Sequence, residues 1–178
     1  MTDHRLPANM ATLDARRNGA TFEIADDGSS YECVRVFGAA PERVFRAFTD
    51  PADLVVWFPS GAPAGSEMTR CESDAIEGGR YHYEMVIPDF GPMAWHGTYT
   101  GVDRPNRIDA NEWFVMGAGE PEGDPAAQTL TFEAVGDGFT LMTMHVDLAE
   151  PEDPETFMEQ SAAGLSSSLA TLDDLVST

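Results

Sequence analysis

Few side chains in this sequence are placed to do chemistry, and two of them stand out. His96 lies beside Trp95 in one strand-like segment, and Glu112 lies beside Trp113 in another. A histidine acts as a general base only with a positioned partner, and a carboxyl group enclosed by apolar groups has a raised pKa. His96 and Glu112 are therefore the weak candidates for catalysis, as an acid/base pair. The simpler alternatives are a structural hydrogen bond for His96 and a surface position for Glu112.

Other catalytic and metal-binding patterns are absent from the sequence. Cys33 and Cys71 are far apart, and no histidine pair has the spacing of zinc ligands on a helix or hairpin. His82 and His145 fall on the polar faces of their segments, so we expect both to be exposed. No glycine-rich phosphate loop or nucleophile elbow appears. The sequence therefore predicts no metal and no cofactor.

Aromatic and methionine side chains recur at alternating positions of the strand-like segments. Tyrosine and tryptophan combine an apolar ring with one polar group, and methionine adapts to irregular surfaces. Such residues either line a pocket or fill a core, and a bulge in any strand would exchange the inward and outward sets. The candidate ligand-binding residues are Trp57, Tyr81, Tyr83, Met85, Trp95, Tyr99, Trp113, Phe132, Met144 and Leu165.

Two short helices are expected early in the chain, each opened by a proline. A residue before proline is disfavoured in the helical conformation, so Ala40 should end the preceding strand. Pro41 then begins the first helix, because its missing N–H group is not needed there. Asp50 should cap the second helix, which begins at Pro51 and ends near Trp57.

The remainder alternates as strands until a final amphipathic helix. Gly117–Gln128 is expected to be a loop because it is rich in glycine, proline and acidic residues. An apolar stripe from Phe157 to Val176 predicts a helix of about 20 residues that begins at Pro154. An antiparallel sheet covered by this helix gives an α+β domain. The predicted strands are Thr21–Ala25, Tyr31–Phe37, Glu67–Glu72, Arg80–Ile87, Met93–Val102, Ile108–Met116, Thr129–Ala134 and Phe139–Leu148.

The composition limits the classes of partner. The chain has 178 residues, which predicts one domain over residues 20–178 after a flexible arm of residues 1–19. The net charge is −21 with no lysine, so nucleic acid and anionic membranes are unsuitable partners. A high-salt host or genome bias explains this acidity most simply, and a cationic partner is the alternative. No secretory signal or membrane-spanning run is apparent, so we expect a cytoplasmic protein.

Several motifs together resemble a known superfamily. The segment Arg35–Trp57 is similar to the opening of the START-like superfamily, also called SRPBCC or helix-grip, and most similar to relatives of the heat-shock protein 90 ATPase activator. Further matching motifs are Gly78-Gly79-Arg80-Tyr81, His96-Gly97-Thr98-Tyr99 and Ala163-Gly164-Leu165. The resemblance implies a curved antiparallel sheet wrapped around a long C-terminal helix, with two short helices after the first strand and a cavity between sheet and helix.

The resemblance implies three alternative functions. The leading hypothesis is a protein that binds a small hydrophobic or aromatic ligand in the cavity. The alternative is a chaperone-interacting protein like the heat-shock protein 90 activators, and a second alternative is a cyclase or hydratase acting on a polyketide-like substrate. We expect a binding protein rather than an enzyme. Exposed strand edges also allow a homodimer.

Overall fold

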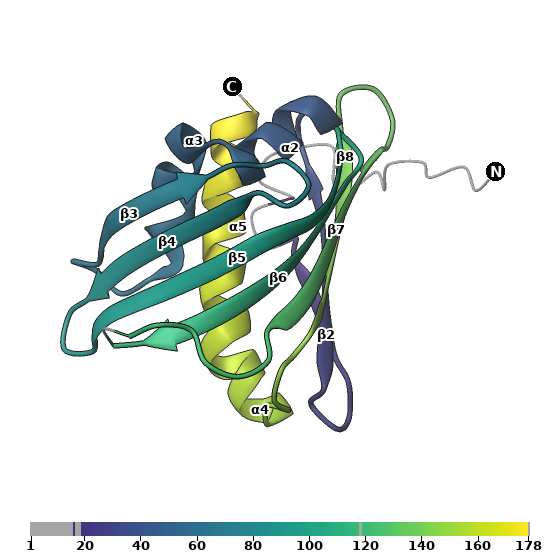
Figure 1. Cartoon of the computed structure of the whole chain (residues 1–178). Helices are drawn as coiled ribbons and strands as arrows, with labels where there is room; N and C mark the ends of the chain where they lie inside the picture. Colours follow the sequence, from purple (N-terminus) through teal and green to yellow (C-terminus); the bar gives the residue numbers. More distant parts are fainter. Residues whose placement is uncertain (1–15, 17–18, 118, 178) are drawn as a thin grey trace.

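The protein is built from one curved sheet around one long helix. The computed structural model describes residues 16, 19–117 and 119–177. Within these residues, eight strands form an antiparallel sheet in the order β1-β2-β8-β7-β6-β5-β4-β3. The helix α5 lies along the concave side of this sheet (Figure 1). The predicted α+β helix-grip fold is confirmed.

The bounds of most elements agree with the sequence patterns. The strands are β1 (Thr21–Ile24), β2 (Ser30–Phe37), β3 (Glu67–Ser73), β4 (Arg80–Ile87), β5 (Gly91–Asp103), β6 (Arg107–Met116), β7 (Ala126–Ala134) and β8 (Thr140–Asp147). The helical elements are α2 (Pro41–Thr49), α3 (Pro51–Trp57), the 3-10 helix η2 (Phe58–Gly61), α4 (Pro154–Thr156), the π-helical segment η3 (Phe157–Ala162) and α5 (Ala163–Val176).

The two proline-initiated helices form as expected. Ala40 is extended, with a ψ angle of 153°, and Pro41 is the first residue of α2. The carboxylate of Asp50 accepts a hydrogen bond from the backbone N–H of Ala52 at 3.0 Å and so caps α3. The apolar sides of both helices are buried in the core, and they close the upper end of the molecule in Figure 1.

The predicted loop Gly117–Gln128 is wrong at its C-terminal end. Strand β7 begins at Ala126, where the backbone pairs with Glu112 of β6, and Gln128 pairs with Ala110. The backbone hydrogen bonds of two neighbouring strands, β6 and β8, hold this segment extended although its side chains are small or polar. The correction places Gln128 inside the sheet.

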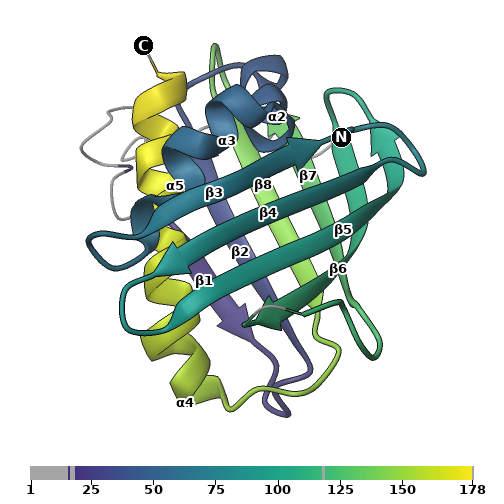
Figure 2. The same ribbon diagram turned by 60° about the vertical axis from the view of Figure 1, so that its left-hand side comes forward.

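The C-terminal helix is interrupted where a continuous helix was predicted. Asp153 caps α4 by accepting a hydrogen bond from the N–H of Thr156 at 2.9 Å. The π-helical turn follows and buries Phe157 against the ring of Tyr31 on β2, at a centroid distance of 4.6 Å. Beyond it, α5 buries Leu169 and Leu172 completely. The interruption therefore lies at the start of the helix, and the covering part is regular (Figure 2).

The two faces of the sheet are chemically distinct. We call the face toward α5 the inner face and the opposite face the outer face. On β4, Tyr81, Tyr83 and Met85 are buried on the inner face, and the alternate residues His82 and Glu84 lie on the outer face. The predicted alternation of this strand is confirmed. Because the strands are in register, β4 fixes which residues of β5 and β6 point inward.

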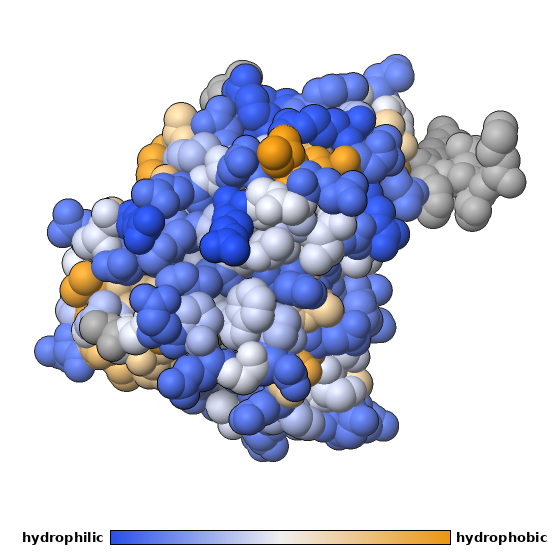
Figure 3. Space-filling view, viewed as in Figure 1, coloured by the Kyte–Doolittle hydropathy of each residue, from blue (hydrophilic) through white to orange (hydrophobic). Residues whose placement is uncertain are grey.

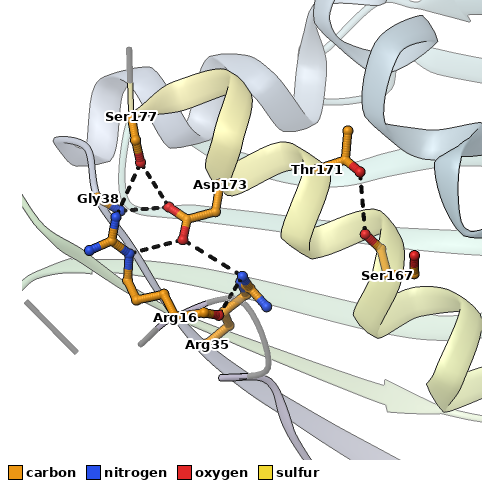
Figure 4. Close-up of polar contacts among 7 residues, drawn as sticks. All are labelled: Arg16, Arg35, Gly38, Ser167, Thr171, Asp173 and Ser177. Carbon is orange, nitrogen blue, oxygen red and sulfur yellow. Dashed lines mark hydrogen bonds and ion pairs between the residues drawn. The ribbon is translucent and has the colours of Figure 1, made fainter. Parts of the chain in front are cut away.

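An ionic cluster fastens the C-terminal end of α5 to the sheet (Figure 4). Fully buried Asp173 accepts hydrogen bonds from Arg16 Nε and from the backbone N–H of Gly38, both at 2.9 Å. Nη2 of buried Arg35 on β2 lies 3.6 Å from the same carboxylate and donates to the backbone oxygen of Arg16 at 2.7 Å. Arg16 belongs to the predicted flexible arm, whose residues 1–15 and 17–18 lie outside the described part of the chain.

Replacing Asp173 tests this fastening. Asp173→Asn leaves two buried guanidinium groups without their shared carboxylate, and it should lower the free energy of unfolding by roughly 3–5 kcal/mol. Urea unfolding followed by circular dichroism measures the change. Asp174→Asn alters the exposed neighbouring acid and serves as the matched control. Equal destabilisation by the two variants would contradict this account of the cluster.

Candidate functional site

Three polar side chains from three strands meet on the inner face. The hydroxyl of Tyr81 on β4 donates to Oε2 of Glu112 on β6 at 2.7 Å. Nε2 of Gln128 on β7 donates to the same hydroxyl at 3.1 Å. Glu112 and Gln128 are partly exposed, whereas Tyr81 is buried. A hydroxyl, a carboxyl and a carboxamide group thus form one polar centre on a largely apolar surface.

A glycine on the intervening strand makes this contact possible. Gly97 on β5 pairs with Tyr81 on one side and with Glu112 on the other. The Tyr81 ring lies over Gly97 so closely that a Cβ atom there would overlap the ring. Any other residue at this position would displace the tyrosine from Glu112. Because Gly97 has no side chain, the Tyr81 ring can lie across β5 and reach Glu112 on β6.

Burial controls the protonation of the polar centre. Loss of solvent raises the pKa of Glu112, and the nearby Tyr81 hydroxyl and Gln128 amide lower it by less. Burial also raises the pKa of Tyr81 and Tyr83 well above the usual value, and the negative charge of Glu112 adds to this. The pKa of Tyr31 on β2 is raised in the same way, first by burial and then by Glu112. Glu112 is thus the acidic group that several inner-face tyrosines share.

Neighbouring rings hold the polar centre in place. Tyr81 stacks on Tyr83 with ring centroids 4.9 Å apart. Tyr99 lies against Tyr81, and its hydroxyl is 2.9 Å from Oγ of Ser73 on β3. These tyrosines keep their protons at neutral pH, and burial raises their pKa further above it. The group therefore offers fixed hydrogen-bonding atoms and contains no activated nucleophile.

The inner face is closed at one end and less covered at the other. Phe58 of η2 packs on Tyr83 and Trp95 at centroid distances of 5.3 and 5.1 Å. Ser168 of α5 joins this end to η2 by accepting from the N–H of Gly61 and donating to the oxygen of Phe58, both at 3.0 Å. At the other end Phe114 packs on Trp95 but remains 52% exposed. The Phe114 side is therefore the more exposed side of the inner face.

Two surface hollows lie outside the space between the inner face and α5. One, of about 660 Å³, lies between the start of α2, the β5–β6 turn and β7. The other, of about 470 Å³, lies on the outer face over His82, His96 and Trp113. Neither of these two lies between the inner face and α5, so the cavity expected there stays a prediction.

Most of the predicted binding residues lie on the α5 side of the sheet, in two groups. Tyr81, Tyr83, Met85, Trp95 and Tyr99 share the inner face with Glu112. Phe132 and Met144 are buried in the same core, Trp57 is fixed there by donating Nε1–H to the oxygen of Ala47 at 2.8 Å, and Leu165 of α5 is partly buried against it.

His96 and Trp113 do not lie with the others. Their register pairs His96 with His82 and with Trp113, and all three side chains project from the outer face. Trp113 donates Nε1–H to the oxygen of Gly123 at 3.0 Å, in the loop that crosses this face. The anticipated pairing of His96 with Glu112 is wrong because strand alternation sends adjacent register rows to opposite faces. Glu112, expected at the surface, instead points inward.

Two residues of the polar centre were missed in the sequence. Gln128 falls in the segment expected to be a loop, although Gln128, Leu130 and Phe132 alternate as one strand face. Gly97 lies between Trp95 and Tyr99 on the inner side of β5, and this gap in an aromatic row was the available signal. The described residues contain no group of three or more histidine, cysteine or acidic side chains that could hold a metal ion. Among them, no helix is both long and apolar enough to span a membrane.

Comparison with known proteins agrees with the fold. Protein Ms6760 from Mycobacterium smegmatis is 24% identical with a TM-score of 0.73, and the match covers 88% of this chain and 96% of that one. CV1439 from Chromobacterium violaceum is 28% identical with a TM-score of 0.66, covering 84% and 98%. An AHSA1-like protein from Aeromonas hydrophila is 20% identical with a TM-score of 0.60, covering 81% and 93%. No curated protein matches the chain.

The family assignment comes from a sequence match over most of the chain. The family model described as activator of Hsp90 ATPase homolog 1-like protein matches residues 38–177. This range runs from the end of β2 to the end of α5 and includes the whole polar centre. The chain therefore belongs to the activator of Hsp90 ATPase homolog 1-like family, within the START-like superfamily.

Proposed function

We propose that this protein binds a small, mainly apolar molecule between the inner face and α5, with a polar group of that molecule at Glu112. The observation that carries the proposal is the polar centre itself. A carboxyl group on an apolar inner surface is costly to bury, yet the fold holds Glu112 there with the Tyr81 hydroxyl donating to it and Gln128 donating to that hydroxyl. Family membership supports the same location, because the resemblance to the helix-grip superfamily implies a cavity between sheet and helix.

The apolar part of the ligand would contact the rings that remain partly uncovered. Trp95 and Phe114 on the sheet and Leu165 on α5 retain exposed surface near the open end. Covering apolar surface gains roughly 25 cal/mol per Å², against a cost of at least about 4 kcal/mol for lost freedom on binding. A ligand of one or two rings therefore depends on the polar centre for part of its affinity.

The charge of the site selects the polar group of the ligand. Tyr81 already donates its hydrogen to Glu112, so the atoms left for a ligand are chiefly acceptors on Glu112 and Gln128. The net charge of −21 adds a general repulsion of anions. The proposed ligand is thus neutral or cationic and carries an O–H or N–H group; a fatty acid or another carboxylate does not fit this description.

A matched pair of aromatic probes tests this selectivity by isothermal titration calorimetry. 2-Naphthol should bind, and 2-naphthoate, which carries a negative charge on a ring system of the same size, should bind at least about tenfold more weakly. Glu112→Gln keeps the shape but removes the charge, so it should reduce this difference. Glu67→Gln on the exposed edge strand β3 should leave the difference unchanged. Absence of 2-naphthol binding, or equal affinities for the two probes, would overturn the proposal.

The raised pKa of Glu112 also predicts a pH-dependent stability. A carboxyl group whose pKa is higher in the folded state is destabilising once it ionises, so the penalty begins above the ordinary value of 4.5 and grows toward neutral pH. Glu112→Gln should therefore raise the urea midpoint relative to the wild type near neutral pH and have little effect below 4.5. Glu67→Gln is again the control. A benefit of Glu112→Gln that is independent of pH would contradict the loss of solvent around this carboxyl group.

A second candidate function is contact with a chaperone of the heat-shock protein 90 class. It is favoured by the family and by apolar side chains gathered at one end of the sheet: Phe90 is 69% exposed and Met116 65% exposed. The register places both near the β4–β5 hairpin, and Figure 3 shows apolar surface over this end. An exposed apolar patch is a common protein-docking surface.

Direct binding to a purified chaperone of this class tests the second candidate. Surface plasmon resonance should detect binding, and Phe90→Ser should weaken it because the exposed ring contributes much of the patch. Val55→Ser, on the exposed side of α3, removes an apolar side chain elsewhere and is the matched control. Absence of binding, or equal loss in both variants, would refute a chaperone contact through this hairpin.

A further inference from the structure

The outer face contains a histidine pair that the proposed function does not use. His82 on β4 and His96 on β5 are directly opposed, with ring centroids 4.1 Å apart and ring planes tilted by 39°. The Nε2 atoms of both rings are buried and have no hydrogen-bond partner. A buried nitrogen without a hydrogen-bond partner costs free energy. Two such nitrogens on adjacent rings indicate that a ligand could bind to both.

The pair lies at the floor of the outer-face hollow of about 470 Å³. Arg70 and Glu72 of β3 also line the hollow and form an ion pair with each other at 2.7 Å. Glu84 of β4 places a carboxylate oxygen 3.9 Å from Nε2 of His82. The remaining lining side chains that bear charge are Arg80 of β4 and Glu120 of the loop between β6 and β7. The lining thus holds two arginines and two glutamates, and Glu84 beside the hollow adds one negative charge.

The surroundings of His82 favour its uncharged form. Burial lowers the pKa of His82, and His96 and Arg70 lower it further, against a smaller opposing effect of Glu84 and Glu72. A neutral imidazole has a free nitrogen lone pair, which is the form that binds a metal ion. The net charge of −21 also raises the local concentration of cations.

We propose that His82 and His96 together bind a divalent transition-metal ion, of the Cu²⁺, Ni²⁺ or Zn²⁺ class, through their Nε2 atoms. Opposed residues on antiparallel strands have Cβ atoms about 4.5–5.5 Å apart, and metal–imidazole bonds of about 2.0–2.1 Å can be made by both rings to one ion. Imidazole ligands select these ions over Mg²⁺ and Ca²⁺, which prefer oxygen.

The pair supplies two protein ligands, and water completes the coordination. The described residues provide no third histidine, cysteine or acidic ligand in place, so Glu72 and Glu84 contribute charge rather than bonds. The site is on the opposite face from Glu112, and it does not depend on the ligand proposed for the inner face.

Copper titration of the untagged chain tests the site. All variants carry His4→Gln, because a histidine near an N-terminus binds Cu²⁺ by itself. Cu²⁺ should quench the fluorescence of Trp113, because Trp113 lies opposite His96 on the neighbouring strand. Loss of a residue that only hydrogen-bonds to a metal ligand commonly weakens metal binding about 10–100-fold. Loss of a ligand itself, in His82→Gln or His96→Gln, should therefore weaken Cu²⁺ binding at least about tenfold. Zn²⁺ should bind more weakly than Cu²⁺.

His145→Gln is the matched control. His145 lies on β8, 3.3 Å from Asp147, and is an exposed histidine beside a carboxylate without a second imidazole. It should not change the affinity for Cu²⁺. Equal affinities of the wild-type site, His82→Gln and His96→Gln, or a loss confined to His145→Gln, would overturn the proposal.

A spectroscopic measurement covers the case in which a glutamine variant does not fold. Electron paramagnetic resonance of one equivalent of Cu²⁺ in the His4→Gln chain should show hyperfine coupling from two imidazole nitrogens. Coupling from one nitrogen or none would contradict a site made by the pair. Circular dichroism of each variant establishes that it is folded before its affinity is compared.

Discussion

The structure depends on covering one apolar face of a strongly curved sheet. The inner face presents rings and aliphatic side chains from every long strand, and α5 is the element that covers it (Figure 1). Asp173 fastens the C-terminal end of this helix to β2 through Arg35 and to the N-terminal region through Arg16. At its middle, Ser168 fastens the helix to η2. With both points fixed, the helix position sets how much of the inner face remains uncovered.

The polar centre acquires its properties from that same enclosure. Glu112 would be an ordinary surface acid on the other side of the sheet, and its loss of solvent on the inner face is what raises its pKa. Gly97 lets Tyr81 reach it across one strand, and the extended start of β7 brings in Gln128. The strand register, the hydrogen bonds and the raised pKa of Glu112 therefore all belong to the polar centre on the inner face. The histidine pair lies on the outer face and is chemically separate.

The sequence predicted those features that depend on local patterns. The proline-initiated helices, the alternation of β4 and the apolar stripe of α5 are all set by neighbouring residues, and they formed as expected. The superfamily resemblance supplied the arrangement of these elements, which local patterns alone leave open. Tertiary pairing decided the rest: Gln128 is extended because β6 and β8 bond to it, and His96 faces outward because β4 sets the register.

A crystal structure of the chain grown with 2-naphthol tests the central claim most directly. We predict the ring system between the inner face and α5, near Trp95 and Phe114, with its hydroxyl within hydrogen-bonding distance of Glu112. An interior filled by side chains, or naphthol bound only at the outer-face hollow, would contradict the account.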